Sequence, residues 1–365
     1  MKIGIFLTVG KIAKGGGVER QFLNLVLNST SNVKYKVFTD SKSKENIIEL
    51  YPNLKNSISS FPLVQNRFSI YIAAAVLLFK IIFFRPSIIH IPNYNAYFRK
   101  LYEIIAKVFP VTLNVIDCRY GVNHGHERYE SLNGFVAQND LKGVYTWYQN
   151  TKSIISELNS NIIILAADCC FTDTRLFKPL KKEKRIVFCA RFSEEKRPLD
   201  FVEAVRNISI KEPNVYNEYS FEMYGGGELE DDVKTAIYAA RLDEKIVVSF
   251  DPFMQNILNN SSIFVSCQMY ENFTSLSMLE AMSSGNAIVA YNVGQTDYFL
   301  QDGVNGFVAL KETPEYLADA IIRCCHDEDR LNNMQRKSCE IVKEQFTRET
   351  FESEFISFLE SCIKN

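Results

Sequence analysis

The sequence predicts an α/β protein with two domains. Apolar, strand-like runs alternate with helical segments along the whole chain, without internal repeats or low-complexity tracts. The chain has 365 residues, of which 47% are hydrophobic and 23% charged, so its core is expected to divide in two. A charged stretch at 178–184 separates two series of strands and is typical of a linker between domains.

The first series begins at the N-terminus. Residues 1–7 lack the apolar region and cleavage site of a signal peptide and instead predict a first strand. The pattern then predicts a helix over 18–27 and strands over 3–9, 35–39, 88–91, 111–116 and 162–166. The apolar run 70–84 contains Lys80 and is shorter than the ~20 residues that span a bilayer. We therefore expect a buried core helix there, with an interfacial helix as the alternative.

The second series shows the same alternation. Its predicted strands cover 185–190, 221–224, 246–249, 263–267, 287–290 and 306–308, with helices between them. The tail over 315–363 is predicted to be helical. Its apolar residues at helical spacing, Phe351, Phe355, Phe358 and Leu359, are expected to pack in a core and not to bind a cofactor.

Charge differs between the two halves of the chain. Residues 1–165 hold 19 Lys and Arg against 10 Asp and Glu, a net of +9, and the remainder holds 22 against 33, a net of -11. Residues 50–100 contain no acid. The basic half suits anionic lipid headgroups or a phosphate-bearing acceptor, and a merely solvated basic surface is the alternative. No nucleic-acid partner is expected.

The nine cysteines include no CxxC spacing, which argues against a disulfide framework or a zinc site and favours a reducing compartment. We expect a cytoplasmic protein, with peripheral attachment at the inner face of the membrane left open.

The most informative segment is 270–285, which sets two carboxylates around a predicted helix start. Glu271 falls on the loop after a buried strand, Thr274 or Ser275 can cap the helix, and Glu280 lies inside it. An anion would bind the free amides near Leu276, and hydroxyl groups would bind the carboxylates, as a nucleotide-sugar requires. The alternative is a capped helix with a surface glutamate at each end.

Other groups follow strand ends. Arg191 and Lys196 come after the first strand of the second series, where they could neutralise a departing diphosphate without a metal. Solvated surface cations are the alternative. Two glycine turns would let a ligand approach bare backbone, one containing Gly16 and Gly17 and the other containing Gly225, although plain turns are equally open. The first lacks the GxGxxG spacing, which disfavours a nicotinamide site.

Together these segments resemble the family 4, or group 1, retaining glycosyltransferases, which have the GT-B fold. The matching segments are 16–20, 173–179, 190–196, 270–285 and 302–307. The resemblance implies two Rossmann-like domains that face each other across a cleft. An acceptor-binding domain would cover 1–176 and a nucleotide-sugar-binding domain 177–345, and a helix over 346–365 would cross back to the first domain.

The resemblance also implies roles for particular residues. Glu271 would contact hydroxyls of the donor sugar, Glu280 the ribose, and Arg191 and Lys196 the diphosphate. Gly16, Gly17, Gly225, Ser275 and Leu276 would complete the donor site. This chain departs from the family by one additional residue between its two acids, and it lacks the glycine usual before the linker, near 166–168.

In the first domain, such enzymes often place a His or Asp after the strand that corresponds to 111–116. Asp117 is the first choice here, with His124 and His126 on the polar loop that follows. A surface loop with incidental histidines is the alternative. His90, on an apolar strand, is expected to be a core residue. The acidic run 327–329 is expected to be a solvated turn, and no metal site is expected.

The implied function is a metal-independent, retaining transfer of a hexose or N-acetylhexosamine. The donor would be a nucleoside diphosphate sugar, with no separate cofactor, and the acceptor a glycan or lipid-linked molecule of bacterial surface polysaccharide biosynthesis. Two alternatives remain: a non-catalytic GT-B-like binding protein and a nucleotide-sugar epimerase.

Overall fold

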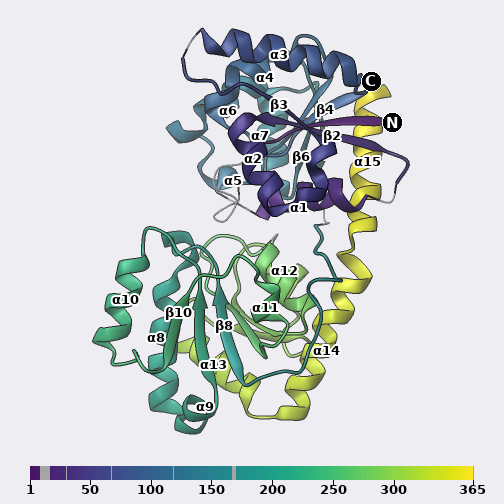
Figure 1. Cartoon of the computed structure of the whole chain (residues 1–365). Helices are drawn as coiled ribbons and strands as arrows, with labels where there is room; N and C mark the ends of the chain where they lie inside the picture. Colours follow the sequence, from purple (N-terminus) through teal and green to yellow (C-terminus); the bar gives the residue numbers. More distant parts are fainter. Residues whose placement is uncertain are drawn as a thin grey trace. The chain divides into compact units, whose positions relative to one another are not determined.

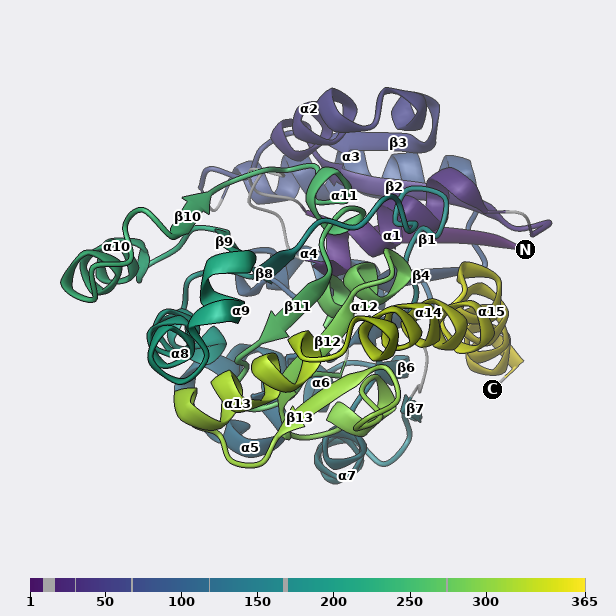
Figure 2. The same cartoon turned by 90° about the horizontal axis from the view of Figure 1, so that it is seen from below.

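The structure, a computed structural model, describes residues 1–8, 17–29, 31–66, 68–117, 119–166, 170–273 and 275–364. It divides the chain into two compact units (Figures 1 and 2). The first comprises Met1–Cys169 and Arg348–Asn365, and the second Cys170–Thr347.

The first unit is built on a parallel sheet. Within the described residues it has seven strands in the order β3-β2-β1-β4-β5-β6-β7. The strands are β1 (Lys2–Phe6), β2 (Lys34–Asp40), β3 (Ile58–Phe61), β4 (Ile88–Ile91), β5 (Val111–Asn114), β6 (Leu141–Thr146) and β7 (Ile163–Ala166). The helices are α1 (Gly17–Asn28), α2 (Ser41–Leu50), α3 (Ser69–Phe84), α4 (Arg99–Ala106), α5 (Tyr120–Asn123), α6 (Glu130–Gln138), α7 (Gln149–Leu158) and α15 (Arg348–Lys364).

Two strands of this sheet were not expected from the sequence. Strand β3 is a four-residue edge strand with two serines at its centre, so it shows no apolar run. Strand β6 lies inside the sheet, but Lys142 and Gly143 interrupt its apolar pattern. A Cβ atom on Gly143 would lie 2.7 Å from the ring of Phe358. The glycine therefore leaves room for α15 to pack on β6.

Helix α15 completes the core of the first unit. The rings of Phe351 and Phe355 pack against Phe22 and Tyr145, and the ring of Phe358 packs against Tyr145. These phenylalanines are buried, as expected from their helical spacing. The C-terminal helix therefore packs back on the N-terminal sheet.

The second unit repeats the plan. Within the described residues its parallel sheet has six strands in the order β10-β9-β8-β11-β12-β13. They are β8 (Arg185–Cys189), β9 (Ser220–Tyr224), β10 (Ile246–Ser249), β11 (Ile263–Ser266), β12 (Ala287–Tyr291) and β13 (Gly306–Ala309). The helices are α8 (Pro198–Lys211), α9 (Pro213–Glu218), α10 (Glu230–Ala239), α11 (Gln255–Leu258), α12 (Leu276–Ser283), α13 (Pro314–Cys325) and α14 (Glu328–Gln345). Each strand expected in this half of the chain is present.

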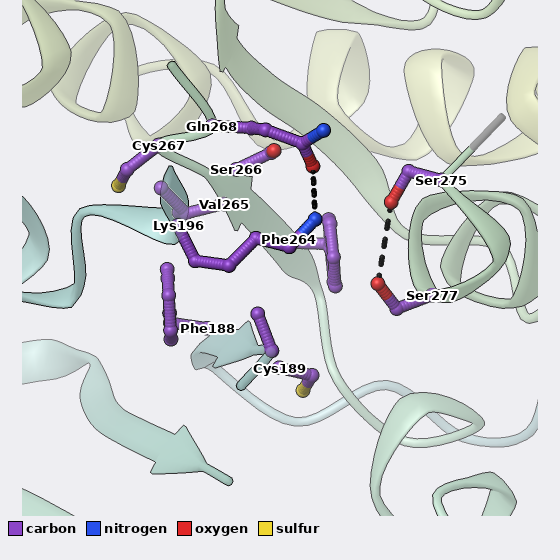
Figure 3. A pocket seen from close by; sticks show the side chains of 11 residues that line it. Phe188, Cys189, Lys196, Phe264, Val265, Ser266, Cys267, Gln268, Ser275 and Ser277 are labelled. Carbon is purple, nitrogen blue, oxygen red and sulfur yellow. Dashed lines mark hydrogen bonds between the residues drawn. The ribbon is translucent and has the colours of Figure 1, made fainter. Parts of the chain in front are cut away.

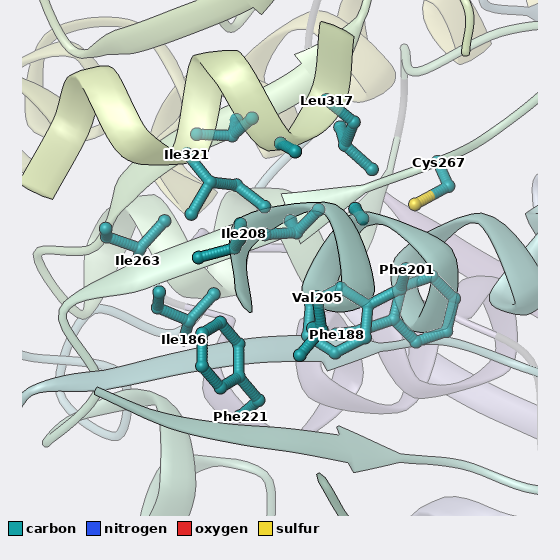
Figure 4. Close-up of a cluster of buried hydrophobic side chains, with 14 of the residues drawn as sticks. Ile186, Phe188, Phe201, Val205, Ile208, Phe221, Ile263, Cys267, Leu317 and Ile321 are labelled. Atoms are coloured by element: carbon teal, nitrogen blue, oxygen red, sulfur yellow. The ribbon is translucent and has the colours of Figure 1, made fainter. Parts of the chain in front are cut away.

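The main core of the second unit lies on one face of its sheet. Figure 4 shows Ile186, Phe188, Phe221 and Ile263 from the strands beneath apolar side chains of α8 and α13. Alternate residues of β8 and β11 point to the opposite face, as the two-residue period of a strand requires. That opposite face includes Cys189, which lies beside Glu280 of α12.

The chain enters the second unit earlier than the expected boundary after residue 176. Asn259 donates to the carbonyl of Leu176 at 2.9 Å and accepts the amide of Lys178 at 3.0 Å. Ser283 donates to the carbonyl of Phe177 at 2.6 Å. These bonds hold the segment that resembles the family's linker on the second unit, so the structure divides the chain between residues 169 and 170.

The expectation that 70–84 is a core helix is wrong for half of its surface. One face of α3 is buried against β3 and α4. Its buried residues are Ala73, Ala74, Leu77 and Ile81. The other face is apolar but exposed. The number of apolar residues in the segment does not show which face is buried, because both faces of the helix are apolar. Among the described helices, none is both long enough and apolar enough to cross a membrane.

Candidate active site

The candidate donor site lies at the carboxyl edge of the second sheet, where the strand order reverses. Strand β8 is flanked by β9 on one side and β11 on the other. The loops that leave β8 and β11 therefore turn to opposite faces, and the crevice between such loops is where open α/β sheets bind ligands. The first loop carries Arg191 and Lys196, and the second carries Glu271 and Ser275.

A small cavity separates these two loops (Figure 3). Its volume is about 20 Å³, which accommodates about one water molecule, so it forms the base of a site and not a nucleotide-sized pocket. Lys196 and Gln268 line one part of it, and Ser275 and Ser277 another. The structure thus brings together two of the predicted donor-site residues, Lys196 and Ser275.

A buried amide connects Lys196 to Glu271. The Lys196 ammonium donates to Oε1 of Gln268 at 2.6 Å, and Nε2 of Gln268 donates to the carbonyl oxygen of Glu271. Because the amide nitrogen of Gln268 is engaged by that carbonyl, its oxygen is directed at the ammonium. Gln268 was not predicted as a site residue. Its position immediately after a buried strand was the available signal.

The Glu271 side chain is buried and accepts hydrogen bonds from two backbone amides. Its Oε1 accepts the amides of Phe273 at 2.9 Å and Gln295 at 2.6 Å, which ties the loop after β11 to the loop after β12. Burial raises the pKa of Glu271, and the backbone hydrogen bonds only partly oppose this shift. Gly294 faces the carboxylate at a φ of 52°, and a Cβ atom there would collide with it. Gly294 was also missed.

The glycine turn after β9 packs against the loop of Arg191. A Cβ atom on Gly225 would collide with the carbonyl oxygen of Ala190, and one on Gly227 would lie 3.2 Å from Cγ of Arg191. Glycine therefore permits close contact between the two loops. Arg191 is exposed, and among the described residues no hydrogen bond or ion pair holds its guanidinium. It can turn toward an anion without breaking an existing interaction.

Helix α12 supplies amides at the same edge. Ser275 is its N-cap and accepts the amide of Met278 at 3.4 Å, and Leu276 is its first residue. Asn272, which was not predicted, fixes the approach to this helix. Its side chain accepts from Ser266 at 2.8 Å and donates to the hydroxyl of Thr296 at 2.8 Å.

Glu280 lies within α12 and is buried. Burial and the neighbouring charge of Glu280 raise the pKa of the Cys189 thiol well above its usual value. Cys189 lines the cavity, so the charge of Glu280 reaches a group at the cavity wall. Thr274, the other helix cap considered, is outside the described residues.

In the first unit, Asp117 follows β5 and organises the loop after it. Its carboxylate accepts the amide of Arg119 at 3.0 Å and the hydroxyl of Tyr129 at 2.9 Å, and it pairs with the guanidinium groups of Arg119 and Arg128. Burial alone would raise the pKa of Asp117, but these donors hold it below its usual value. The carboxylate is thus ionised and engaged by its own loop.

His124 and His126 lie on that same loop and are both exposed. The carbonyl of His124 accepts the Asn133 amide at 2.9 Å, and the ring of His126 accepts the amide of Arg128 at 3.2 Å. The ring of His124 thus remains at the surface while its backbone is fixed.

The N-terminal glycines can be placed only in part. Gly17 is the first residue of α1, whereas Gly16 lies outside the described residues. Glu19 in the first turn of α1 accepts from Asn93, which follows β4, at 2.6 Å. This contact holds the start of α1 near the point where the strand order of the first sheet reverses, between β1 and β4.

The other polar candidates are structural. His90 is fully buried between Phe22 and Phe355, as expected for a core residue. Asp327 caps α14 by accepting the amide of Arg330 at 3.0 Å. Within the described part of the chain, no three His, Cys, Asp or Glu side chains gather as metal ligands would.

Comparison with known proteins agrees with this geometry. Residues 172–340 match the family described as Glycosyl transferases group 1, which confirms for this segment the family that the motifs indicated. No curated protein matches the sequence closely enough to add to this finding.

Solved structures match three quarters or more of the chain. Anabaena Alr3699/HepE, in complex with UDP-glucose, is 15% identical, with a TM-score of 0.78 over 99% of this chain and 100% of its own. Sucrose-phosphate synthase from Thermosynechococcus elongatus is 14% identical, with a TM-score of 0.73 over 98% of each chain. The pneumococcal O-GlcNAc transferase GtfA, in complex with UDP and GlcNAc, is 17% identical, with a TM-score of 0.59 over 75% of this chain and 56% of its own. The chain therefore has the GT-B fold, and its residues 172–340 match the group 1 glycosyl transferase family.

Proposed function

We propose that this protein transfers a hexose or N-acetylhexosamine from a nucleoside diphosphate sugar to a hydroxyl group of a glycan or lipid-linked acceptor. The transfer retains the anomeric configuration and needs no metal. The observation that carries the proposal is that Lys196, Ser275 and Ser277 line one cavity where the strand order of the second sheet reverses, with Arg191 on the same loop as Lys196. Two cations and the helix amides suit the phosphate groups of a ligand, and the two buried acids suit its hydroxyl groups.

Stabilisation of the leaving diphosphate is the main chemical task of this site. The ammonium of Lys196, oriented by Gln268, and the free guanidinium of Arg191 would neutralise the charge that develops on the diphosphate. The amides of Leu276 and Ser277 at the start of α12 would add hydrogen-bond donors. Such fixed donors can replace a divalent cation, which is why we propose metal-independent catalysis.

Retention would follow from attack on the same face as departure. The bond between C1 of the sugar and the phosphate oxygen breaks with its electron pair on the oxygen. The acceptor oxygen then bonds to C1 on that face, and its proton passes to the departing phosphate oxygen. Glu271 would position sugar hydroxyls by holding the surrounding loops, and Glu280 would contact the ribose.

The choice of donors to test follows from the matching structures. Because HepE was solved with UDP-glucose and GtfA with UDP and GlcNAc, UDP-glucose and UDP-N-acetylglucosamine are the first candidates. The acceptor would bind the basic first unit. There, the hydrogen bonds of Asp117 support a positioning role, and the exposed ring of His124 is the group best able to contact substrate. The product would enter bacterial surface polysaccharide biosynthesis.

The decisive experiment is turnover of these donors by the wild type and by Lys196→Ala. We expect the variant to lose about a hundredfold in turnover because its leaving-group stabilisation is removed. Lys234→Ala is the matched control, since Lys234 is exposed on α10 and, within the described residues, pairs with Glu230 of the same helix. Equal turnover by Lys196→Ala and the wild type would remove the diphosphate assignment.

The products separate the alternatives. NMR of the anomeric proton distinguishes retention from inversion, and unchanged turnover in EDTA is expected for a metal-independent reaction. Binding of donors without any turnover would favour a non-catalytic protein. Conversion of the donor to an epimer in the absence of acceptor would favour an epimerase.

A further inference from the structure

Helix α3, drawn along the upper margin of Figure 1, presents an exposed apolar stripe on the first unit. Its large side chains are Phe68 (75% exposed), Tyr71 (61%), Ile72 (47%), Phe79 (71%), Ile82 (56%) and Phe83 (83%). At 100° per residue, these positions fall within one arc of about 120°, opposite the buried face of Ala73, Ala74, Leu77 and Ile81. Isolated exposed apolar residues are ordinary, but a continuous stripe of this kind marks an interaction surface.

The stripe has the dimensions of an interfacial helix. Its 16 residues extend over about 24 Å, and the helix lies flat on the sheet because its other face packs over β3 and α4. An isolated membrane-surface helix turns its polar face to water. In α3 that second face packs on the first unit instead, and only the apolar stripe is exposed. The aromatic rings of Phe79 and Phe83 would enter the boundary between headgroups and acyl chains.

Cations flank this stripe. The Lys80 ammonium donates to the carbonyl of Ser60, and Arg85 ends the helix and is exposed. Lys2 donates to the carbonyl of Phe84 at 2.9 Å. No Asp or Glu occurs between residues 50 and 100, which include the whole helix.

A second group of lysines extends the positive charge toward β2. Burial, together with the neighbouring charges of Lys44 and Lys80, lowers the pKa of Lys36. The Lys36 ammonium thus lies close enough to those of Lys44 and Lys80 to be repelled by each. Anions placed beside them would relieve this repulsion.

We propose that the α3 stripe is a docking surface for the anionic face of a lipid bilayer. An apolar strip bordered by cations matches acyl chains beneath anionic headgroups. A second copy of the chain fits less well, because a two-fold pair would bring the same cations to both sides of the contact. The inference depends on the surface of the first unit and not on the reaction proposed above.

Cosedimentation of the full-length protein with vesicles tests this surface. The wild type should bind vesicles that contain phosphatidylglycerol more strongly than vesicles of phosphatidylcholine alone, and added salt should weaken that binding. The double variant Phe79→Ser/Phe83→Ser should bind the anionic vesicles about tenfold more weakly, since two aromatic anchors are removed. Arg85→Gly should weaken binding about fivefold by loss of one cation. Glycine adopts the φ of 55° at this position without strain.

The matched control is Tyr238→Ser/Leu310→Ser, which removes two equally exposed apolar side chains from the second unit and should leave vesicle binding unchanged. Equal binding by the Phe79→Ser/Phe83→Ser variant and the wild type would overturn the proposal, as would equal binding to neutral vesicles. A solution dimer that this variant converts to a monomer would assign the stripe to a second copy instead. Donor turnover with a water-soluble acceptor should be the same in all these variants, which separates this test from that of the proposed function.

Discussion

At the scale of single residues, buried polar side chains give the candidate site its fixed geometry. Gln268 orients the ammonium of Lys196, and Asn272 ties the loop after β11 to Ser266 and Thr296. Both amides are buried, so their hydrogen bonds are costly to break. Lys196 is thus held in place before a ligand arrives, and little ordering remains to be done when the donor binds.

His90 leads to a prediction about acid stability. Burial lowers its pKa to about 3, and its Nδ1 lies 3.0 Å from the hydroxyl of Thr112. In the unfolded chain the same ring has its ordinary pKa of 6.5. Between these values the unfolded state binds a proton that the folded state does not, so stability falls as the pH falls from about 6.5 to about 3. The loss from His90 is about 5 kcal/mol across that range.

The variant His90→Gln should therefore be less sensitive to acid than the wild type. Unfolding can be followed by the fluorescence of Trp147, the only tryptophan in the sequence, which is buried in the first unit. His326→Gln, which changes an exposed histidine of the second unit, should leave the pH dependence as it is. Parallel pH profiles for wild type and His90→Gln would contradict the assignment.

At the scale of elements, one carboxylate anchors the C-terminal helix. Oε1 of Glu352 accepts the hydroxyls of Ser29 at 2.5 Å, Ser31 at 2.6 Å and Tyr35 at 3.1 Å. Burial and the adjacent Glu352 raise the pKa of Tyr35 above its usual value. The helix is thus joined by polar contacts to the loop after α1 and to β2, as well as by its aromatic face.

Glu352→Ala should destabilise the first unit by about 3 kcal/mol, because three hydroxyls that are at least partly buried lose their shared acceptor. Urea denaturation with Trp147 fluorescence measures this change. Glu360→Ala is the control, since Glu360 is an exposed residue of the same helix. An unchanged midpoint in Glu352→Ala would show that the aromatic contacts alone hold the helix.

Some helices and strands of this chain can be predicted from its sequence, and others cannot. Strands with uninterrupted apolar runs, such as β12 and β13, were predicted, as were helices with one apolar face. Strand β6 was missed because its Gly143 makes room for α15, which lies more than two hundred residues later in the sequence. The exposed face of α3 was missed because composition measures how apolar a helix is and not which face is covered. Both errors come from tertiary contacts that local patterns do not contain.

At the scale of the whole molecule, the chain forms two units with separate cores. The sequence predicted the α/β class and the GT-B fold, because strand runs and motifs occur in a characteristic order. It also indicated three candidate donor-site residues that follow strands, Arg191, Lys196 and Glu271. It did not indicate Gln268 or Gly294, whose importance depends on which loops meet in space. Likewise, it could not show that the carboxylate of Asp117 is engaged by its own loop.

Truncation of the chain after Thr347 should destabilise the first unit and leave the second unit folded. The four buried residues Phe351, Phe355, Phe358 and Leu359 contribute about 2 kcal/mol each, or roughly 8 kcal/mol together. This is comparable to the whole stability of a domain, about 5 to 15 kcal/mol. The truncated protein should lose the unfolding transition reported by Trp147, while calorimetry still shows a transition of the second unit. A Trp147 transition like that of the full chain would contradict this expectation.

The helix at the end of the chain has a further consequence for biosynthesis. A ribosome makes the first sheet early, but the surface formed by Phe22, His90 and Tyr145 stays uncovered until α15 has been made. The second unit, whose residues are continuous, can finish folding before the first. The apolar surface of the first sheet therefore stays exposed to aggregation while the second unit is being made, and a chain that stops before α15 leaves that surface uncovered.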